Sequence, residues 1–436
     1  MKALDLAEHK RRRQQLMMEM GTGSVAVLPA APVSLRNNDV DYVYRQDSHF
    51  DYLCGFQEAD AVLVLVPGGT EGQELLFCQE KDPNKERWSG LRVGQEAAIR
   101  DYGFDQCWAI QELDDRMLTI LGQCKQVYTI WGRDADFDKQ LVEWLNRLRK
   151  AVRQGSGTPS CYVALEHWLN ASRLIKSPAE IDQMQKAADI SVLAHEKAMQ
   201  ECQSGMYEYE IEAGLMDCFM RQGCRHAAYP SIVAGGENAC ILHYTNNDAV
   251  LKDGDLLLLD AGAEFAGYAA DITRTIPVNG RFSESQKTLY ELVLAAQLAA
   301  IAVLRPGVSY RASHEAAVAV LTKGLLALGL LSGDYDDVIR DEAYTRFYMH
   351  GTSHWLGRDV HDVGEYKQDG DWRLLEEGMT LTIEPGLYIS PADDIDEKWW
   401  NIGIRIEDDV LVTATGSRVL TAALVKSVVE IESLMQ

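Results

Sequence analysis

Hydrophobic residues in the first third of the chain fall into short runs separated by turn-forming residues. Three runs, 24–29, 61–66 and 75–78, have the length and composition of β-strands. The Pro-Gly-Gly sequence at 67–69 separates the last two runs, so they are predicted to form a hairpin. The stretch 36–56 is polar and aromatic and has no clear period.

The pattern becomes helical in the second part of the chain, where the first helix has a strong start signal. Ser177 suits the N-cap, Pro178 suits the first helical position, and Glu180 completes a capping box. The pattern predicts a helix over 178–200 and, after a glycine turn, a second helix over 208–221.

The same order of elements recurs further along the chain. Ser283 and Gln286 form a second capping pair ahead of an apolar helix, Gly307 makes a turn, and another helix ends near Gly329. Strand-like segments follow each helix pair, although the residue identities of the two halves match poorly. This part is therefore predicted to be a duplicated α+β domain in which helices cover one face of a curved antiparallel sheet.

Two carboxylates lie at the edge of the most apolar strand. Asp260 ends the run 256–259, which is Leu-Leu-Leu-Leu, and Asp271 lies in the strand-like alternation 270–276. If 263–268 forms the connection, the two strands are neighbours and the aspartates face each other. Carboxylates so close repel unless a positive group lies between them. Two unrelated surface turns are the alternative.

Histidines and further carboxylates follow in the last quarter of the chain. His350 and His354 share a face, but Gly351 disfavours a helix between them, and the Glu of an H-E-x-x-H zinc helix is missing. A lone histidine would more often be a core residue. His243 and His361 make a cluster more plausible.

Two acidic positions in this region also end or interrupt predicted strands. Glu384 follows an apolar strand, and Pro385 favours an extended backbone there. In the segment 402–408 isoleucines alternate with Arg405 and Glu407, which therefore share a polar face. A solvent-facing ion pair is the alternative for these two residues.

Together these positions offer a mostly oxygen ligand set: the two aspartates Asp260 and Asp271, one of the histidines, and the two glutamates Glu384 and Glu407. Such a set with one imidazole suits Mn²⁺, Co²⁺ or Fe²⁺ better than a structural zinc ion. Carboxylates able to bridge suit two ions about 3.5–4 Å apart, as in hydrolases.

Composition limits the classes of function. The 436 residues suggest two domains, and the net charge of −24 argues against a nucleic-acid partner. The basic cluster 9–13 is predicted to be a solvated helix face. The nine cysteines form no C-x-x-C pair, which favours reduced thiols in the cytoplasm. We expect no signal peptide and no membrane span, since the apolar run 289–304 is predicted to be a buried helix.

In order and context, the motifs LLLLDAG, ADITRT, HGTSHWLG, TIEPGLY and GIRIEDD resemble those of the pita-bread metallopeptidases, and most closely the aminopeptidase P family. The stretch 44–50 and the Gly-Phe pair at 55–56 also resemble that family's accessory domain. The similarity spans nearly the whole chain, and the five-ligand pattern is highly specific. It implies an N-terminal α/β accessory domain over 1–175 and a pita-bread catalytic domain over 176–436.

The resemblance also implies a role for each site residue. Asp260 would hold one metal ion, Asp271 and Glu407 would bridge both, and His354 and Glu384 would hold the other. Glu384 would also carry a proton. His243 and His361 would stabilise the tetrahedral intermediate by hydrogen bonding. The proline side of the pocket would be lined by His350, Tyr388 and Arg405.

The implied activity is removal of the N-terminal residue from peptides with proline in second position, by attack of a metal-bridging hydroxide. An Xaa-Pro bond has no N–H and its ring crowds the carbonyl, so it needs a dedicated pocket. The family suggests two manganese ions, with cobalt and iron left open. Relatives are often dimers or tetramers, so we expect a homo-oligomer. Trp88 and Arg153 are expected to be structural, although by analogy they could reach a neighbouring subunit's site.

Several relatives with related folds are the alternatives. Prolidase cleaves Xaa-Pro dipeptides with the same site but tends to have longer insertions than the 30 positions from His354 to Glu384 and the 23 from there to Glu407. Methionine aminopeptidase usually lacks a large N-terminal domain, and creatinase lacks the metal ligands. A non-enzymatic pita-bread binding module would have lost ligands that this chain retains.

Overall fold

The computed structural model describes residues 6–69, 73–155 and 157–436. The chain divides into two compact units, an N-terminal unit that ends at Asn170 and a C-terminal unit that begins at Ala171.

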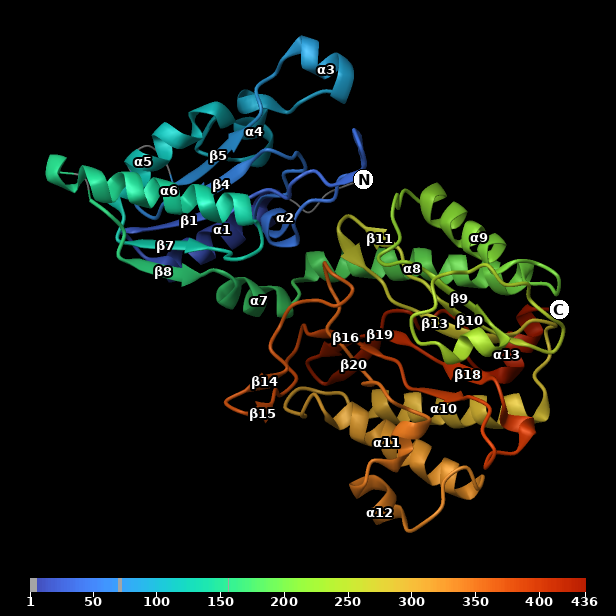
Figure 1. Cartoon of the computed structure of the whole chain (residues 1–436). Coiled ribbons are helices and arrows are strands. Elements are labelled where there is room, and N and C mark those ends of the chain that lie inside the picture. Colours follow the sequence, from blue (N-terminus) through green and yellow to red (C-terminus); the bar gives the residue numbers. More distant parts are fainter. Residues whose placement is uncertain (1–5, 70–72, 156) are drawn as a thin grey trace. The chain divides into compact units, whose positions relative to one another are not determined.

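The N-terminal unit is built on a six-stranded sheet in the order β6-β5-β4-β1-β7-β8 (Figure 1). Its strands are β1 (Ser24–Pro29), β4 (Val62–Leu65), β5 (Glu74–Cys78), β6 (Gln106–Ala109), β7 (Gln126–Thr129) and β8 (Cys161–Ala164). Neighbours are parallel except that β4 is antiparallel to both β1 and β5. The pairing of β4 with β5 confirms the predicted hairpin.

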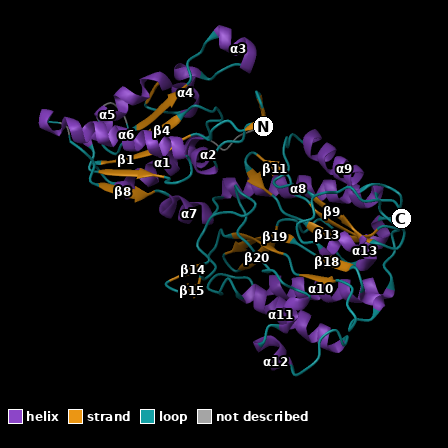
Figure 2. Ribbon diagram, viewed as in Figure 1, coloured by secondary structure: helices purple, strands orange, loops and turns teal. Residues whose placement is uncertain are grey.

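Helices lie on both faces of this sheet (Figure 2). The helices of this part of the chain are α1 (Leu6–Met20), α2 (Ser48–Cys54), α3 (Pro83–Ser89), α4 (Gly94–Tyr102), α5 (Leu113–Gln123), α6 (Ala135–Ala151) and α7 (Glu166–Leu174). Of these, α3 buries no residue and lies away from the sheet, and α7 continues into the C-terminal unit. Alternate residues of β1 enter two different cores, with Val25 and Val27 packed among residues of α5 and α6, and Ala26 and Leu28 among residues of α1 and α2. A small hairpin of β2 (Leu35–Asn37) and β3 (Val40–Asp41) precedes α2.

One prediction for this unit is wrong. The basic cluster is not a solvated face, because Arg12 and Arg13 are fully buried and Arg13 forms an ion pair with Glu74 at 2.7 Å. The local pattern shows that these residues are charged but not which distant residue pairs with them. Trp88 is 92% exposed, and its role stays a prediction.

The C-terminal unit contains two long helix pairs. Figure 1 shows its main strands lying between α8 and α9 on one side and α10 and α11 on the other. The helices are α8 (Pro178–Glu201), α9 (Glu208–Arg221), α10 (Glu284–Ala302), α11 (Ala312–Ala327), α12 (Tyr335–Arg340) and α13 (Val428–Leu434). Capping boxes at Ser177 and Ser283 start α8 and α10, as predicted. Among the residues described, no helix has both the length and the apolar character needed to cross a membrane.

The strands of this unit form antiparallel sheets that repeat with the helix pairs. The first half has the order β13-β10-β9, from β9 (Ile232–Gly235), β10 (Leu256–Asp260) and β13 (Thr273–Pro277). The second has the order β16-β19-β20, from β16 (Thr380–Ile383), β19 (Asp408–Thr413) and β20 (Gly416–Val419). Two-stranded pairs complete the set, namely β17 (Gly386–Ile389) with β18 (Ile402–Arg405), β11 (Glu264–Phe265) with β12 (Tyr268–Ala269), and β14 (Lys367–Gln368) with β15 (Asp371–Trp372).

The strand that ends at Asp260 pairs with the next long strand, as the sequence predicted. Asp260 lies opposite Thr273 in the antiparallel register of β10 and β13. Asp271, however, precedes β13 by two residues instead of lying within it. Its backbone N–H donates to the side-chain carboxylate of Asp409 in β19 at 3.2 Å and not to a backbone carbonyl of a paired strand. The pairing was thus predicted correctly, but not the point where the strand begins.

Candidate metal centre

Four acidic side chains lie at ends or interruptions of strands in the C-terminal unit. Asp260 ends β10, Asp271 precedes β13, Glu384 directly follows β16, and Glu407 lies between β18 and β19. His354 is adjacent to Trp355, which forms a β-bridge with a residue of β16. All five line one cavity of about 490 Å³. The fold therefore brings together the complete ligand set predicted from the sequence.

Three of these residues form the tightest cluster. Ligand atoms of Asp271, His354 and Glu407 all lie within 4.8 Å of one another. The Nε2 atom of His354 is 3.3 Å from Asp271 Oδ2 and 3.5 Å from Glu384 Oε1. Its Nδ1 atom lies 3.0 Å from the carbonyl oxygen of Trp355 and can donate to it. That hydrogen bond leaves Nε2 directed at the carboxylates, as a metal-binding imidazole requires.

Burial makes this cluster electrostatically costly. It raises the pKa of Asp271, raises that of Glu384 to about 7, and raises that of Glu407 well above its usual value. The nearby carboxylates raise the pKa of His354 to about 9, although burial alone would lower it. Among the described residues that line the cavity, Arg405 is the one arginine or lysine. Negative charge is thus in excess, and divalent cations would offset it.

The donor set fits such cations. Carboxylate oxygens with a single imidazole nitrogen are the ligands that Mn²⁺, Co²⁺ and Fe²⁺ accept, and no thiolate is among the described lining residues.

Arg405 is tied to one of the ligands. Its guanidinium donates to Asp260 at 2.5 Å, to Thr273 Oγ1 at 3.1 Å and to the Tyr388 hydroxyl at 3.0 Å. The Tyr229 hydroxyl donates to the other oxygen of Asp260 at 2.7 Å. Arg405 is only 4% exposed, so the alternative of a solvent-facing pair with Glu407 is wrong.

The remaining predicted residues surround this cluster. His243, His350 and His361 line the cavity, and the His361 ring lies 4.4 Å from that of His354. Burial lowers the pKa of His361, and burial together with the charge of Arg405 lowers that of His350 to about 4. Tyr388 is not among the described lining residues; its hydroxyl lies 2.8 Å from His350 Nε2.

Four residues near the ligands were missed in the sequence, and one of them is Tyr229, which no pattern singled out. Of the others, Thr273 donates to Glu407 at 2.7 Å, Thr382 donates to Glu384 at 3.3 Å, and Asp409 accepts from the backbone of Asp271. Each of these three lies two positions from one of the predicted ligands. The strand period of two could have identified them, because such residues share a face.

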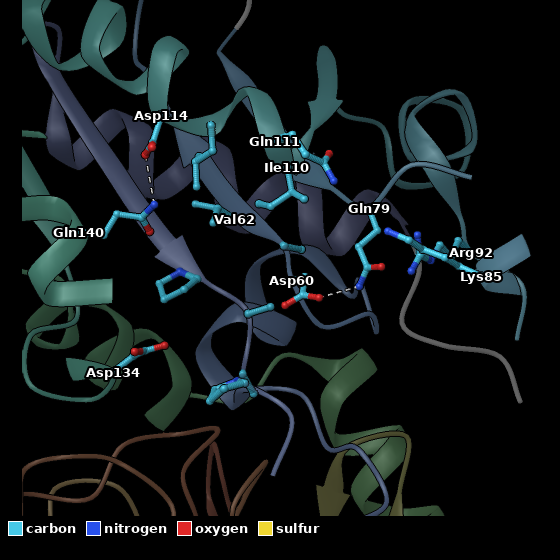
Figure 3. Close-up of a pocket in the computed structure, with 16 residues that line it drawn as sticks. Asp60, Val62, Gln79, Lys85, Arg92, Ile110, Gln111, Asp114, Asp134 and Gln140 are labelled. Atoms are coloured by element: carbon cyan, nitrogen blue, oxygen red, sulfur yellow. Dashed lines mark hydrogen bonds between the residues drawn. The ribbon is translucent and has the colours of Figure 1, made fainter. Parts of the chain in front are cut away.

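A second cavity, of about 530 Å³, lies in the N-terminal unit (Figure 3). Its carboxylates have local structural partners: Asp60 accepts from Gln79 at 2.8 Å, Asp114 accepts from Gln140 at 3.2 Å, and Asp134 caps α6. No histidine is among its described lining residues. Its greater volume therefore does not make it the chemical site.

The duplicated α+β unit and its buried carboxylate cluster define the class of metal-dependent hydrolases. Comparisons with known proteins identify the family. A model of metallopeptidase family M24 matches residues 182–414, and a model of the aminopeptidase P N-terminal domain matches residues 9–130. The chain belongs to metallopeptidase family M24, which confirms the predicted resemblance, the fold class and the hydrolase activity.

Individual relatives cover the whole chain. The Xaa-Pro aminopeptidase of Escherichia coli is 44% identical over 436 residues, which are 100% of this chain and 99% of that protein. The solved structure of Pseudomonas aeruginosa aminopeptidase PepP matches with a TM-score of 0.99 and 51% identity, covering 100% of this chain and 99% of that one. The structure of E. coli aminopeptidase P with the inhibitor Pro-Leu matches with a TM-score of 0.96 and 44% identity, at the same coverage.

Proposed function

We propose that this protein removes the N-terminal residue from peptides that have proline in second position. The observation that carries this proposal is the clustering of Asp271, His354 and Glu407, with ligand atoms within 4.8 Å, in a cavity that three further histidines line. Full-length relatives named Xaa-Pro aminopeptidase support the substrate class.

Two divalent ions, manganese in the first instance, would occupy the cavity. Asp260 would hold one, His354 and Glu384 the other, and Asp271 and Glu407 would bridge them. When bound, the ions lower the pKa of water and polarise a carbonyl group. The buried carboxylates carry more negative charge than Arg405 and His354 can balance, which supports the presence of two divalent cations.

The protein's own side chains would then handle the proton and the developing charge. Glu384 lines the same cavity and would take a proton from the attacking water and deliver it to the proline nitrogen. His243 and His361 line the same cavity and would donate hydrogen bonds to the oxygen that becomes negative in the tetrahedral intermediate.

The proline side would be formed by His350 and Arg405, with Tyr388 acting on both. Tyr388 is bonded to each of them, at 2.8 and 3.0 Å, and so fixes their orientation. Leu242 and Val360 add apolar surface to the same cavity. Such a lining suits a proline ring, which has no N–H to satisfy.

The test compares an Xaa-Pro dipeptide with an Xaa-Pro-Xaa tripeptide, each with Mn²⁺, beside a metal analysis. Turnover of the tripeptide is expected. Turnover of the dipeptide alone would indicate a prolidase. Protein that contains no transition metal and hydrolyses neither peptide after Mn²⁺ addition would favour a non-enzymatic binding module.

The proposal includes a cytoplasmic homo-oligomer, either a dimer or a tetramer. The nine cysteines are free thiols, which supports a reducing compartment. Light scattering of the purified protein measures the oligomeric state, and a monomer at micromolar concentration would contradict it.

A further inference from the structure

The loop 357–362 in the C-terminal unit carries two residues into the catalytic cavity. Val360 and His361 line that cavity. Asp359 and Asp362, which flank them, bind cations on a different segment. The position of His361 therefore depends on what holds the two aspartates.

One of these cations, Arg173, lies in the last turn of α7, and the other, Lys176, lies between α7 and α8. Arg173 donates to Asp359 at 2.7 Å and to Asp362 at 2.5 Å, and Lys176 donates to the other oxygen of Asp362 at 3.0 Å. The side chains of Arg173, Lys176 and Asp362 are each 1% exposed. Each of the two cations thus contacts at least one carboxylate, and Asp359, at 29%, is the more exposed of the two aspartates.

Close packing and backbone bonds fix the same loop. A Cβ atom on Gly357 would lie 2.1 Å from Asp362 Oδ2 and 2.8 Å from Lys176 Cε. The backbone N–H of Asp362 donates to the carbonyl of Trp355 at 2.8 Å. The ion network therefore contacts Gly357 and also the segment that contains His354 and Trp355. A shift of Arg173 would for this reason shift His361.

We propose that Arg173 is a positioning residue for catalysis, which holds His361 at the reacting carbonyl through Asp359 and Asp362. This inference rests on the proposed function, in which His361 acts in the transition state. No residue of this network is one of the five predicted metal ligands, so loosening the network should lower kcat by more than it lowers the bound metal, with KM nearly unchanged.

The test uses Arg173→Lys, which keeps the charge but ends one atom short of Nη2, the nitrogen that contacts both carboxylates. We expect kcat on an Xaa-Pro-Xaa peptide to fall about tenfold or more, since small displacements of catalytic groups have effects of this size. In a His361→Ala background the same change should have almost no effect on kcat, because the group that Arg173 positions is gone. Asp359→Asn, at a partly exposed position, is the milder variant if Arg173→Lys does not fold.

Hydrogen exchange gives a readout that does not depend on turnover. In Arg173→Lys the amides of 357–362 should exchange at least about tenfold faster, while those of β10 stay protected. Arg13→Lys is the matched control, because Arg13 is equally buried and forms an ion pair with Glu74 in the N-terminal unit. It should leave both kcat and the exchange of this loop unchanged.

Three outcomes would overturn the inference. They are equal losses of kcat with and without His361, unchanged exchange in the loop, and loss of bound metal in parallel with kcat. Wild-type enzyme that turns over no Xaa-Pro peptide would instead refute the proposed function, and exchange alone would then decide whether Arg173 anchors the loop.

Discussion

Two adjacent residues, Glu407 and Asp408, lie in opposite electrostatic environments. Glu407 faces the metal centre, where burial and neighbouring carboxylates raise its pKa well above the usual value. Asp408 accepts from Arg274 at 2.8 Å and from Lys426 at 2.6 Å. Although burial alone would raise its pKa, these two cations lower it to about 2. Both residues are buried, and they differ in whether the protein supplies the balancing charge.

The difference separates a structural carboxylate from one that needs a ligand. Asp408 also accepts from Gln297 at 2.7 Å and from Thr421 at 2.8 Å, so its hydrogen-bonding capacity is used within the chain. In the metal centre, by contrast, several buried carboxylates have too few cationic side chains beside them to balance their charge. A buried charge without a partner is costly, and its retention in a cavity is typical of a functional site.

The largest expected effect is on activity and comes from the metal centre, where the protein does not balance the buried negative charge. Alanine at any of the five ligands, such as Glu407→Ala, should lower turnover by about a thousandfold or more, because metal-derived transition-state stabilisation amounts to several kcal/mol. The protein should remain folded, as circular dichroism would show. Retained activity in Glu407→Ala would refute its bridging role.

Loss of Asp408, whose charge is balanced within the protein, should lower stability instead of activity. Asp408→Ala leaves the fully buried Arg274 and the partly exposed Lys426 without their carboxylate partner, so we expect the free energy of unfolding to fall by about 3 kcal/mol. Urea denaturation of metal-free protein measures this change. Glu407→Ala is the matched control and should cost little, since it removes a repelled charge. An equal loss of stability in both variants would contradict the distinction between the two environments.

His361→Ala should separate metal binding from catalysis. We expect the metal content to stay unchanged and kcat to fall about a hundredfold, which corresponds to ~2.7 kcal/mol, because one hydrogen bond to the developing negative charge is lost. Mass spectrometry of the native protein and steady-state kinetics check the two parts. A parallel loss of metal would mean that His361 is a ligand.

The smallest expected effect on the free energy of unfolding is its dependence on pH. The folded pKa of Asp408 is about 2, below its ordinary value of 3.8. Its contribution, about 2 kcal/mol, is therefore complete above pH 4 and is lost as the pH falls toward 2. Comparing the acid unfolding of the wild type with that of Asp408→Asn measures the contribution of the ionised Asp408 to stability. Identical acid unfolding in both proteins would show that Asp408 is not held by its cations.

Metal affinity should also fall with falling pH, but at a higher pH than the contribution of Asp408. Because the pKa of Glu384 is raised to about 7 in the metal-free protein, protons compete with cations below that pH. Mn²⁺ affinity should fall steadily between pH 7 and pH 5, as calorimetry can measure. Affinity independent of pH in this range would argue against Glu384 as a ligand.

The sequence alone determined the elements with local signals. Capping boxes at Ser177 and Ser283 begin α8 and α10, and the leucine run ends at Asp260 in the structure as predicted. The family pattern supplied the five ligand positions, which the structure brings to one cavity. These features depend on residues close in sequence or on a motif spread along the chain.

Only the tertiary structure decided which charges are paired. Arg405 binds Asp260 across 145 positions, and Arg173 binds Asp362 across 189. The burial of Arg13 likewise depends on Glu74. A local pattern specifies that a residue is charged and which face it shares. The desolvation and the distant partner that set its pKa and its role arise only when the strands and loops pack together.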